Sequence, residues 1–198
     1  MASRRRFLQI GATAGAWPLV ARAAQAAGLD TVGGPHTPLL AVVYDARLAA
    51  SVSFGRRAEA LGLRAHAIEG DMTRLWYDEV YHRWQERPAA LAGLTAHGPM
   101  FCFVELARDV RMRLVFRAEH QPTAGAALTH AFRAPVSMLS DAVDACRRPG
   151  SFGVAMADVV SRCPSGRAEI AEATMPGGPA LPEADALYTW VIAPAVPA

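Results

Sequence analysis

The chain has 198 residues, of which 52% are hydrophobic, and a formal net charge of +2. This length and apolar content suit one domain with a sizeable core. The 20 basic residues are all arginine, which excludes chemistry that depends on a lysine base or a lysine Schiff base.

The N-terminus carries the run Ser3-Arg4-Arg5-Arg6-Phe7-Leu8-Gln9, then a weakly apolar stretch and small-residue cleavage patterns that end at Ala23 and Ala26. Through Ser3, Arg4, Arg5, Phe7 and Leu8 the run resembles a twin-arginine (Tat) export signal, in which Lys is common where Gln9 stands. The resemblance implies that the Tat translocase delivers the folded protein to the bacterial periplasm, and that residues 1–26 are cleaved after Ala23 or Ala26.

Two other interpretations of this segment stay open, a basic cytosolic arm and a retained membrane tether. The apolar run of about 13 residues is too short to span a bilayer. Cleavage would remove four arginines from 20 and leave 16 against 18 acidic residues, a net charge of −2. A chain with that charge has no clustered basic face, so we expect no nucleic-acid partner.

Three cysteines follow, Cys102, Cys146 and Cys163. An oxidising destination permits a disulfide, and Cys146 and Cys163 are the expected pair because both lie near turn signals. Cys102 stands in the apolar run Phe101-Cys102-Phe103-Val104 and is expected to be a small buried hydrophobe. No haem or iron–sulfur spacing is present, so no cofactor is evident from the sequence.

After a Gly- and Pro-rich linker at 27–37, residues 38–198 read as one domain. Short apolar runs predict strands at 39–44, 63–68, 90–94 and 112–116, and helical spacing predicts a helix after each of the first three. Alternation of this kind favours a three-layer α/β fold with a mainly parallel sheet of four βα-type units.

The last third of the domain is less regular. The pattern predicts a strand at 129–133, a helix around 136–146 and a helix at 152–163. Two further strands are expected at 168–175 and 187–194, separated by a loop rich in Gly and Pro. We interpret this pair as an antiparallel hairpin added to the edge of the sheet.

Polar residues stand where the first four predicted strands end, and these ends recur every 24 to 26 residues. Ligands of open parallel sheets bind outside the carboxyl ends of the strands. The sequence therefore predicts one ligand-binding crevice, formed by Asp45, Arg47, Asp71, Thr73, Thr95, His97, Glu119 and His120.

Three chemical uses of this crevice stay open. A divalent metal would suit the carboxylate and imidazole groups of Asp45, Asp71, Glu119 and His120, although no metal-spacing motif is present. Arg47 and the backbone N–H groups of 71–73 would suit a carboxylate or phosphate. A histidine beside a carboxylate, at His97 or His120, would suit acid–base catalysis.

A structural interpretation competes with all three. In it the histidines lie in surface loops, Asp71 and Thr73 cap a helix, and Asp45 pairs with Arg47. An aromatic stripe at Trp76, Tyr77, Tyr81 and Trp84 is likewise expected to pack on the sheet rather than to stack a ligand.

The export route supplies the functional expectation. Tat substrates commonly fold around a cofactor or with a cofactor-bearing partner, and this chain has no cofactor motif. We expect a small accessory subunit or maturation partner of a larger redox enzyme, with an exposed apolar patch near Trp190 and the hairpin. A periplasmic module that binds a small anionic or aromatic compound is the alternative, followed by a stand-alone hydrolase or lyase.

Overall fold

The computed structural model of the protein describes residues 38–123, 128–147, 152–164, 168–176 and 186–195. These residues belong to one compact unit that extends from Gly34 to Ala198. The predicted export signal at 1–26 and the linker at 27–37 lie outside the described residues, so both stay predictions.

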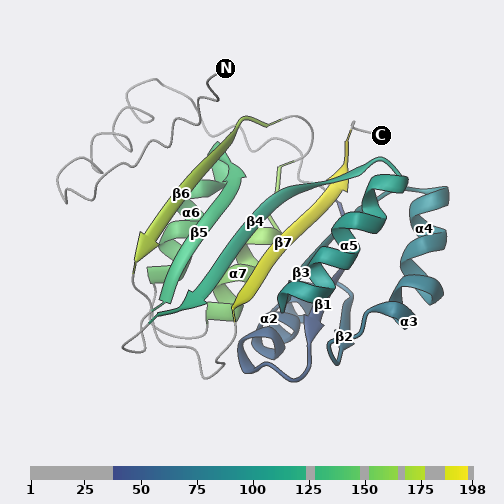
Figure 1. Cartoon of the computed structure of the whole chain (residues 1–198), viewed down its shortest axis with the longest axis horizontal. Helices are drawn as coiled ribbons and strands as arrows, with labels where there is room; N and C mark the ends of the chain where they lie inside the picture. The colour runs from purple at the N-terminus through teal and green to yellow at the C-terminus, as the bar shows by residue number, and fades with distance from the viewer. Residues whose placement is uncertain (1–37, 124–127, 148–151, 165–167, 177–185, 196–198) are drawn as a thin grey trace, which may run out of the picture. The chain divides into compact units, whose positions relative to one another are not determined.

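The described residues form one mixed sheet of seven strands in the order β2-β1-β3-β7-β4-β5-β6 (Figure 1). The strands are β1 Leu39–Asp45, β2 Ala65–Ile68, β3 Ala90–Thr95, β4 Met112–Pro122, β5 Leu128–Pro135, β6 Ile170–Pro176 and β7 Leu187–Pro194. The chain is therefore α/β, as its alternating pattern indicates.

The prediction of a mainly parallel sheet is wrong. Within the described strands only β1–β2 and β1–β3 pair in parallel, and the other four pairings are antiparallel. Two of these four pairings involve β7, which inserts between β3 and β4 and runs against both, and the other two join β4 to β5 and β5 to β6. Since a strand pairs through its backbone, nothing in the local sequence of β3 or β4 shows that a later segment separates them.

The predicted C-terminal hairpin is wrong for the same reason. Strand β7 lies in the middle of the sheet, where its residues from Leu187 to Ala193 are all buried, whereas β6 lies at the edge beside β5. An edge position leaves alternate residues of β6 exposed. The two strands therefore occupy separate positions, with β4 and β5 between them.

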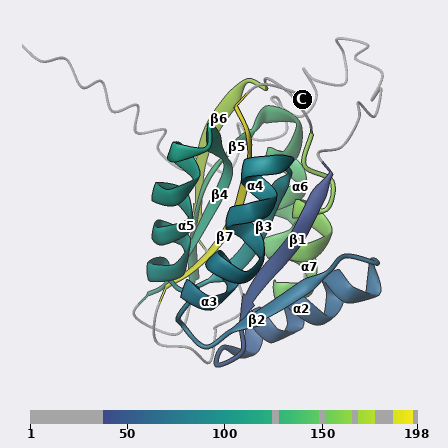
Figure 2. The same cartoon turned by 90° about the vertical axis from the view of Figure 1, so that its right-hand side faces the viewer.

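Helices cover both faces of the sheet, as Figures 1 and 2 show. One face carries α2 Ala49–Ala60, α6 Val136–Arg147 and α7 Phe152–Val160. The other carries α5 His97–Asp109 and a continuous segment made of α3 Thr73–Leu75, a π-helical turn η1 Trp76–Val80 and α4 Tyr81–Glu86. We call these the α6/α7 face and the α5 face.

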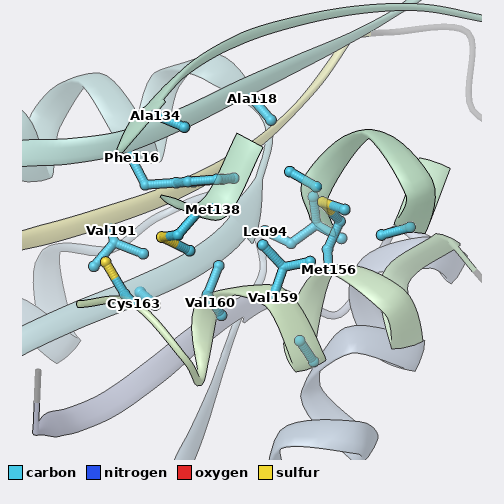
Figure 3. Packing of buried hydrophobic residues seen from close by; sticks show 14 of the residues in the cluster. Leu94, Phe116, Ala118, Ala134, Met138, Met156, Val159, Val160, Cys163 and Val191 are labelled. Carbon is cyan, nitrogen blue, oxygen red and sulfur yellow. The ribbon is translucent and has the colours of Figure 1, made fainter. Parts of the chain in front are cut away.

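Each face has its own apolar core. On the α6/α7 face, Phe116, Met138, Met156 and Val160 pack together (Figure 3). The core of the α5 face contains the rings of Trp76, Trp84, Phe103 and Trp190. The aromatic stripe is thus half core, because Tyr77 and Tyr81 stay exposed.

Trp190 corrects a further expectation. Its side chain is 0% exposed and packs against Phe103, with ring centroids 5.4 Å apart, so it does not form a surface patch. Gly93 on the neighbouring strand makes this position possible, since a Cβ there would overlap the indole ring.

No helix among the described residues is both long and apolar enough to cross a membrane.

Candidate functional site

The carboxyl ends of the first four strands lie at one rim of the sheet. Strand β7 is antiparallel to both β3 and β4, so β4 runs in the same direction as β1, β2 and β3 although it does not pair with them. In register, Tyr188 of β7 lies between Thr95 of β3 and Glu119 of β4. The rim therefore exists, with Tyr188 as a member that the sequence pattern does not select.

The side chains at this rim divide between the two faces of the sheet. Strand β4 continues to Pro122, past its predicted end at 116, so Glu119 and His120 lie inside the strand and point to opposite sides. Glu119 shares the α5 face with Thr95 and Tyr188, whereas His120 lies among the buried residues of the α6/α7 face. The predicted crevice therefore cannot contain both Glu119 and His120, because they lie on opposite faces of the sheet.

Asp45 and Arg47 form an ion pair at the end of β1. The Arg47 guanidinium donates through Nε to Oδ1 at 2.9 Å and through Nη2 to Oδ2 at 2.7 Å. The side-chain hydrogen bond and the charge of Asp45 raise the pKa of Arg47. The guanidinium also lies so close to Gly70 that a Cβ there would overlap it. The ion pair of Asp45 with Arg47 is the one that the structural interpretation expects, and Arg47 also lies beside the loop after β2.

Asp71 lies just before α3, whose N-cap is Met72, and bonds to the first residue of the helix. Its Oδ1 accepts a hydrogen bond from the backbone N–H of Thr73 at 2.8 Å, at the start of α3. Hydrogen bonds from the side chain and the backbone of Thr73 lower the pKa of Asp71. An exposed carboxylate at this position satisfies the first turn of the helix, which is a structural role.

Glu119 is the hub of the remaining rim residues on the α5 face. Its carboxylate accepts hydrogen bonds from Tyr188 Oη at 3.0 Å and Arg117 Nη2 at 3.1 Å, and another from Gln121. Burial, then the hydrogen bond to Glu119, raises the pKa of Tyr188. The exposed His97 ring lies edge-on to Tyr188, with centroids 5.2 Å apart. Each group already has a protein partner.

Two cavities lie elsewhere on the molecule. One of about 270 Å³ is lined by residues that include His66, Glu79 and His82, and one of about 430 Å³ by residues that include Asp141, Asp158 and Arg162. None of the eight residues of the predicted crevice lines either cavity. The rim residues instead bond to one another or to nearby backbone groups.

A second polar group lies in the core of the α6/α7 face and consists of His120, His130 and Cys146. One ligand atom from each side chain lies within 4.8 Å of the other two. His120 on β4 and His130 on β5 are direct cross-strand partners, and Cys146 comes from the last turn of α6. The two histidines are 0% exposed and Cys146 is 2% exposed.

The geometry around His120 fixes its ring. Its Nδ1 lies 2.7 Å from Nδ1 of His130, and its Nε2 lies 3.0 Å from Oγ1 of the buried Thr189. The ring of Phe152 packs edge-on against it, with centroids 4.2 Å apart. If Nε2 donates to Thr189, the lone pair of Nδ1 points toward His130, which is the tautomer that a metal-binding histidine needs.

The protonation states of this cluster suit a metal ion. Burial and the neighbouring His130 hold the pKa of His120 well below 6.5, so its imidazole is neutral. Burial also raises the pKa of Cys146 to about 12. A buried thiol stays protonated unless a cation replaces its proton, and thiolate and neutral imidazole are both strong ligands for transition metals.

The donor distances are compatible with one ion. Metal–nitrogen bonds of about 2.0 Å and metal–sulfur bonds of about 2.3 Å place neighbouring donor atoms roughly 3.3–4 Å apart. The two Nδ1 atoms, now 2.7 Å apart, would separate by less than about 1.5 Å to reach that spacing. The separations that involve the Cys146 sulfur are at most 4.8 Å, close to the same range.

The predicted disulfide is absent. Cys146 and Cys163 are both free thiols in the structure. Cys146 lies instead in the histidine cluster, whereas Cys163 is a core residue of the α6/α7 face (Figure 3). Cys102 is exposed on α5, which corrects its expected burial. The turn signals near Cys146 and Cys163 indicate only that the chain turns at each position. They do not indicate that the two cysteines lie close enough to bond.

Sequence reasoning selects His120 but misses its partners His130 and Cys146. A signal for His130 exists, because Leu128, His130 and Phe132 alternate along a strand, and two of the three are large and apolar. The same alternation places His130 on the buried face of β5. No spacing rule links the pair to Cys146, since that contact depends on how α6 packs on the sheet.

Known proteins give no further information about this site. Comparisons with models of protein families, with curated proteins and with solved structures find no match to this chain.

Proposed function

We propose that the protein is an exported accessory protein that binds one transition-metal ion through His120, His130 and Cys146. The observation that carries the proposal is the convergence of two imidazoles and one thiol, all buried, within 4.8 Å of one another. Two imidazoles and one thiol that meet at one point are a typical donor set for a transition-metal ion, and their burial keeps water from competing for that position.

Metal binding fits the cluster better than catalysis does. A catalytic base must touch its substrate, and these three side chains are at most 2% exposed, with both histidines packed against Phe152. A metal ion needs little space beyond the positions of its ligands. Thr189 supplies an outer contact for Nε2 of His120, of the kind that orients ligating histidines in metal sites.

The export signal that the N-terminus resembles supports the same proposal. A route that carries folded proteins allows a metal to be bound before export, in a compartment that keeps Cys146 reduced. If the metal is bound before export, the protein arrives in the periplasm already loaded, which suits an accessory role. The protein would hold or hand over a metal ion for a larger redox enzyme, and no cofactor motif of its own is needed.

Equilibrium titration tests the proposal. The mature protein, reduced and under nitrogen, is titrated separately with Zn²⁺, Co²⁺ and Cu⁺, each against a chelator of known affinity. We expect at least one ion to bind at one equivalent per chain, with a thiolate charge-transfer band when Co²⁺ or Cu⁺ binds.

Two variants make the titration specific to the cluster. Cys146→Ala removes the thiolate ligand and is expected to abolish tight binding. Cys163→Ala is the matched control, because Cys163 is 1% exposed and its pKa is also raised to about 12, yet it lies outside the cluster. Failure of all three ions to bind, or equal binding by both variants, would contradict the proposal.

A further inference from the structure

We infer that the ion selected by this site is monovalent copper, Cu⁺, and that the site keeps copper reduced. The inference rests on the proposed metal-binding function and concerns the identity and oxidation state of the ion. Its basis is the charge of the donor set, which contains one group that ionises on binding and two that stay neutral.

The charge balance favours a monovalent ion. Neutral imidazoles from His120 and His130 and a thiolate from Cys146 give the ligand set a charge of −1. Cu⁺ makes the loaded site neutral, whereas Zn²⁺ or Cu²⁺ leaves a net charge of +1. Among the described Asp, Glu, His and Cys residues, no carboxylate joins the group to cancel that charge.

The surroundings make the extra charge costly. Phe152 packs on both imidazoles, with ring centroids 4.2 and 6.0 Å away, and Phe132 packs on them at 6.4 and 6.2 Å. The outer contact of His120 is the uncharged hydroxyl of Thr189. A buried charge without a counter-charge costs several kcal/mol, so a divalent ion is penalised here relative to Cu⁺.

The number and softness of the donors agree with this choice. Structural Zn²⁺ sites take four protein ligands, and catalytic ones complete three protein ligands with water. Among the described His, Cys, Asp and Glu residues, three bring their donor atoms together here, in a place with almost no exposure. Cu⁺ is a soft ion for which a thiolate is a preferred ligand, and three-fold coordination needs no water.

Binding of Cu⁺ changes the oxidation state of neither the copper nor the protein. The Cys146 thiol loses its proton as the sulfur–copper bond forms, so Cu⁺ enters and one H⁺ leaves, and copper stays monovalent. Oxidation to Cu²⁺ would return a charge of +1 to the apolar core. The same cost that selects Cu⁺ over Zn²⁺ therefore opposes oxidation of the bound ion.

Competition between ions tests the inference. Mature protein loaded under nitrogen with one equivalent of Cu⁺ is dialysed against Zn²⁺, and a second sample is loaded in the reverse order, with metal content measured after each. We expect both orders to end with copper bound and a preference of at least about 100-fold over Zn²⁺. The X-ray absorption edge should keep its Cu⁺ form after exposure to air.

The possible outcomes separate the two proposals. If Zn²⁺ binds one equivalent through Cys146 and displaces Cu⁺, the metal-binding function stands and the choice of Cu⁺ is wrong. Rapid air oxidation to a Cu²⁺–thiolate site with an intense visible band also overturns the inference alone. If neither ion binds in a way that depends on Cys146, the proposed function fails with it. Cys163→Ala is the control in each case and should retain the behaviour of the original chain.

Discussion

The two faces of the sheet treat their polar residues in opposite ways. At the rim of the α5 face, Tyr188 and Arg117 both donate to Glu119, and the side chains of Arg117 and Glu119 keep some contact with solvent. On the α6/α7 face, His120, His130 and Cys146 are enclosed by apolar side chains. The solvated group can be explained by structure alone, whereas the buried cluster is the one to which we assign the proposed metal site.

The largest expected effect comes from opening the enclosed cluster. Phe152→Ala removes a ring that packs on both histidines and is expected to cost about 3–5 kcal/mol of unfolding free energy. Phe101→Ala, on the exposed side of α5, should cost less than about 0.5 kcal/mol. Urea denaturation measures both, and similar losses would contradict the contrast between the two faces.

Metal binding should stabilise the protein only through the enclosed cluster. At a free-ion concentration of 100 times the dissociation constant, we expect about 2.7 kcal/mol of added unfolding free energy. Glu119→Gln at the rim should keep this gain, and Cys146→Ala should lose it. The check is denaturation of each variant with and without the ion. A gain that depends on Glu119 would move the site to the other face.

A smaller effect is expected at Ser51, a buried residue of α2 that bonds to the backbone of β1 and β3. Ser51 on α2 accepts a hydrogen bond from the backbone N–H of Asp45 at 2.7 Å and donates to the carbonyl of Leu94. Ser51→Ala leaves a buried N–H without this partner and should cost about 1–3 kcal/mol. The control is Ser53→Ala on the same helix, whose hydroxyl bonds to the carbonyl of Ala49 near solvent. Thermal unfolding of the two variants should separate them.

The smallest expected effect is a change of titration at the rim. Burial and the hydrogen bond to Glu119 raise the pKa of Tyr188 above its usual value of 10.0. Glu119→Gln removes the negative charge, so the pKa of Tyr188 should fall toward 10.0 but stay above it because burial remains. Phenolate absorbance against pH, with Tyr188→Phe to identify the signal, measures the change. An unchanged titration would show that Glu119 does not act on Tyr188.

Much of the local structure can be predicted from the sequence. The apolar run at 39–44 matches β1, and the pattern at 187–194 matches β7. The strand order cannot, because the pairing of β7 with β3 joins residues about 100 positions apart. A clue is nevertheless present. The mostly apolar character of Leu187–Ile192, interrupted only by Thr189, is typical of a central strand, whereas Glu172 and Thr174 of β6 are typical of an edge.

The candidate site, like the strand order, can be predicted only in part from the sequence. Asp45, Thr95 and Glu119 reach one rim, as the spacing of the strand ends predicts, because strand direction is set by the alternation of strands and helices. The face that each side chain occupies depends on where a strand ends, and β4 is longer than predicted. This difference sends His120 to the other side of the sheet, where α6 brings Cys146 to it.

The most direct test of the account is the X-ray absorption spectrum of the metal-loaded protein. We predict a first coordination shell with one sulfur and two imidazole nitrogens, unchanged in Cys163→Ala and without the sulfur in Cys146→Ala. A shell made only of oxygen and nitrogen in the original chain, or a sulfur signal that survives in Cys146→Ala, would contradict the claim that His120, His130 and Cys146 form a metal site.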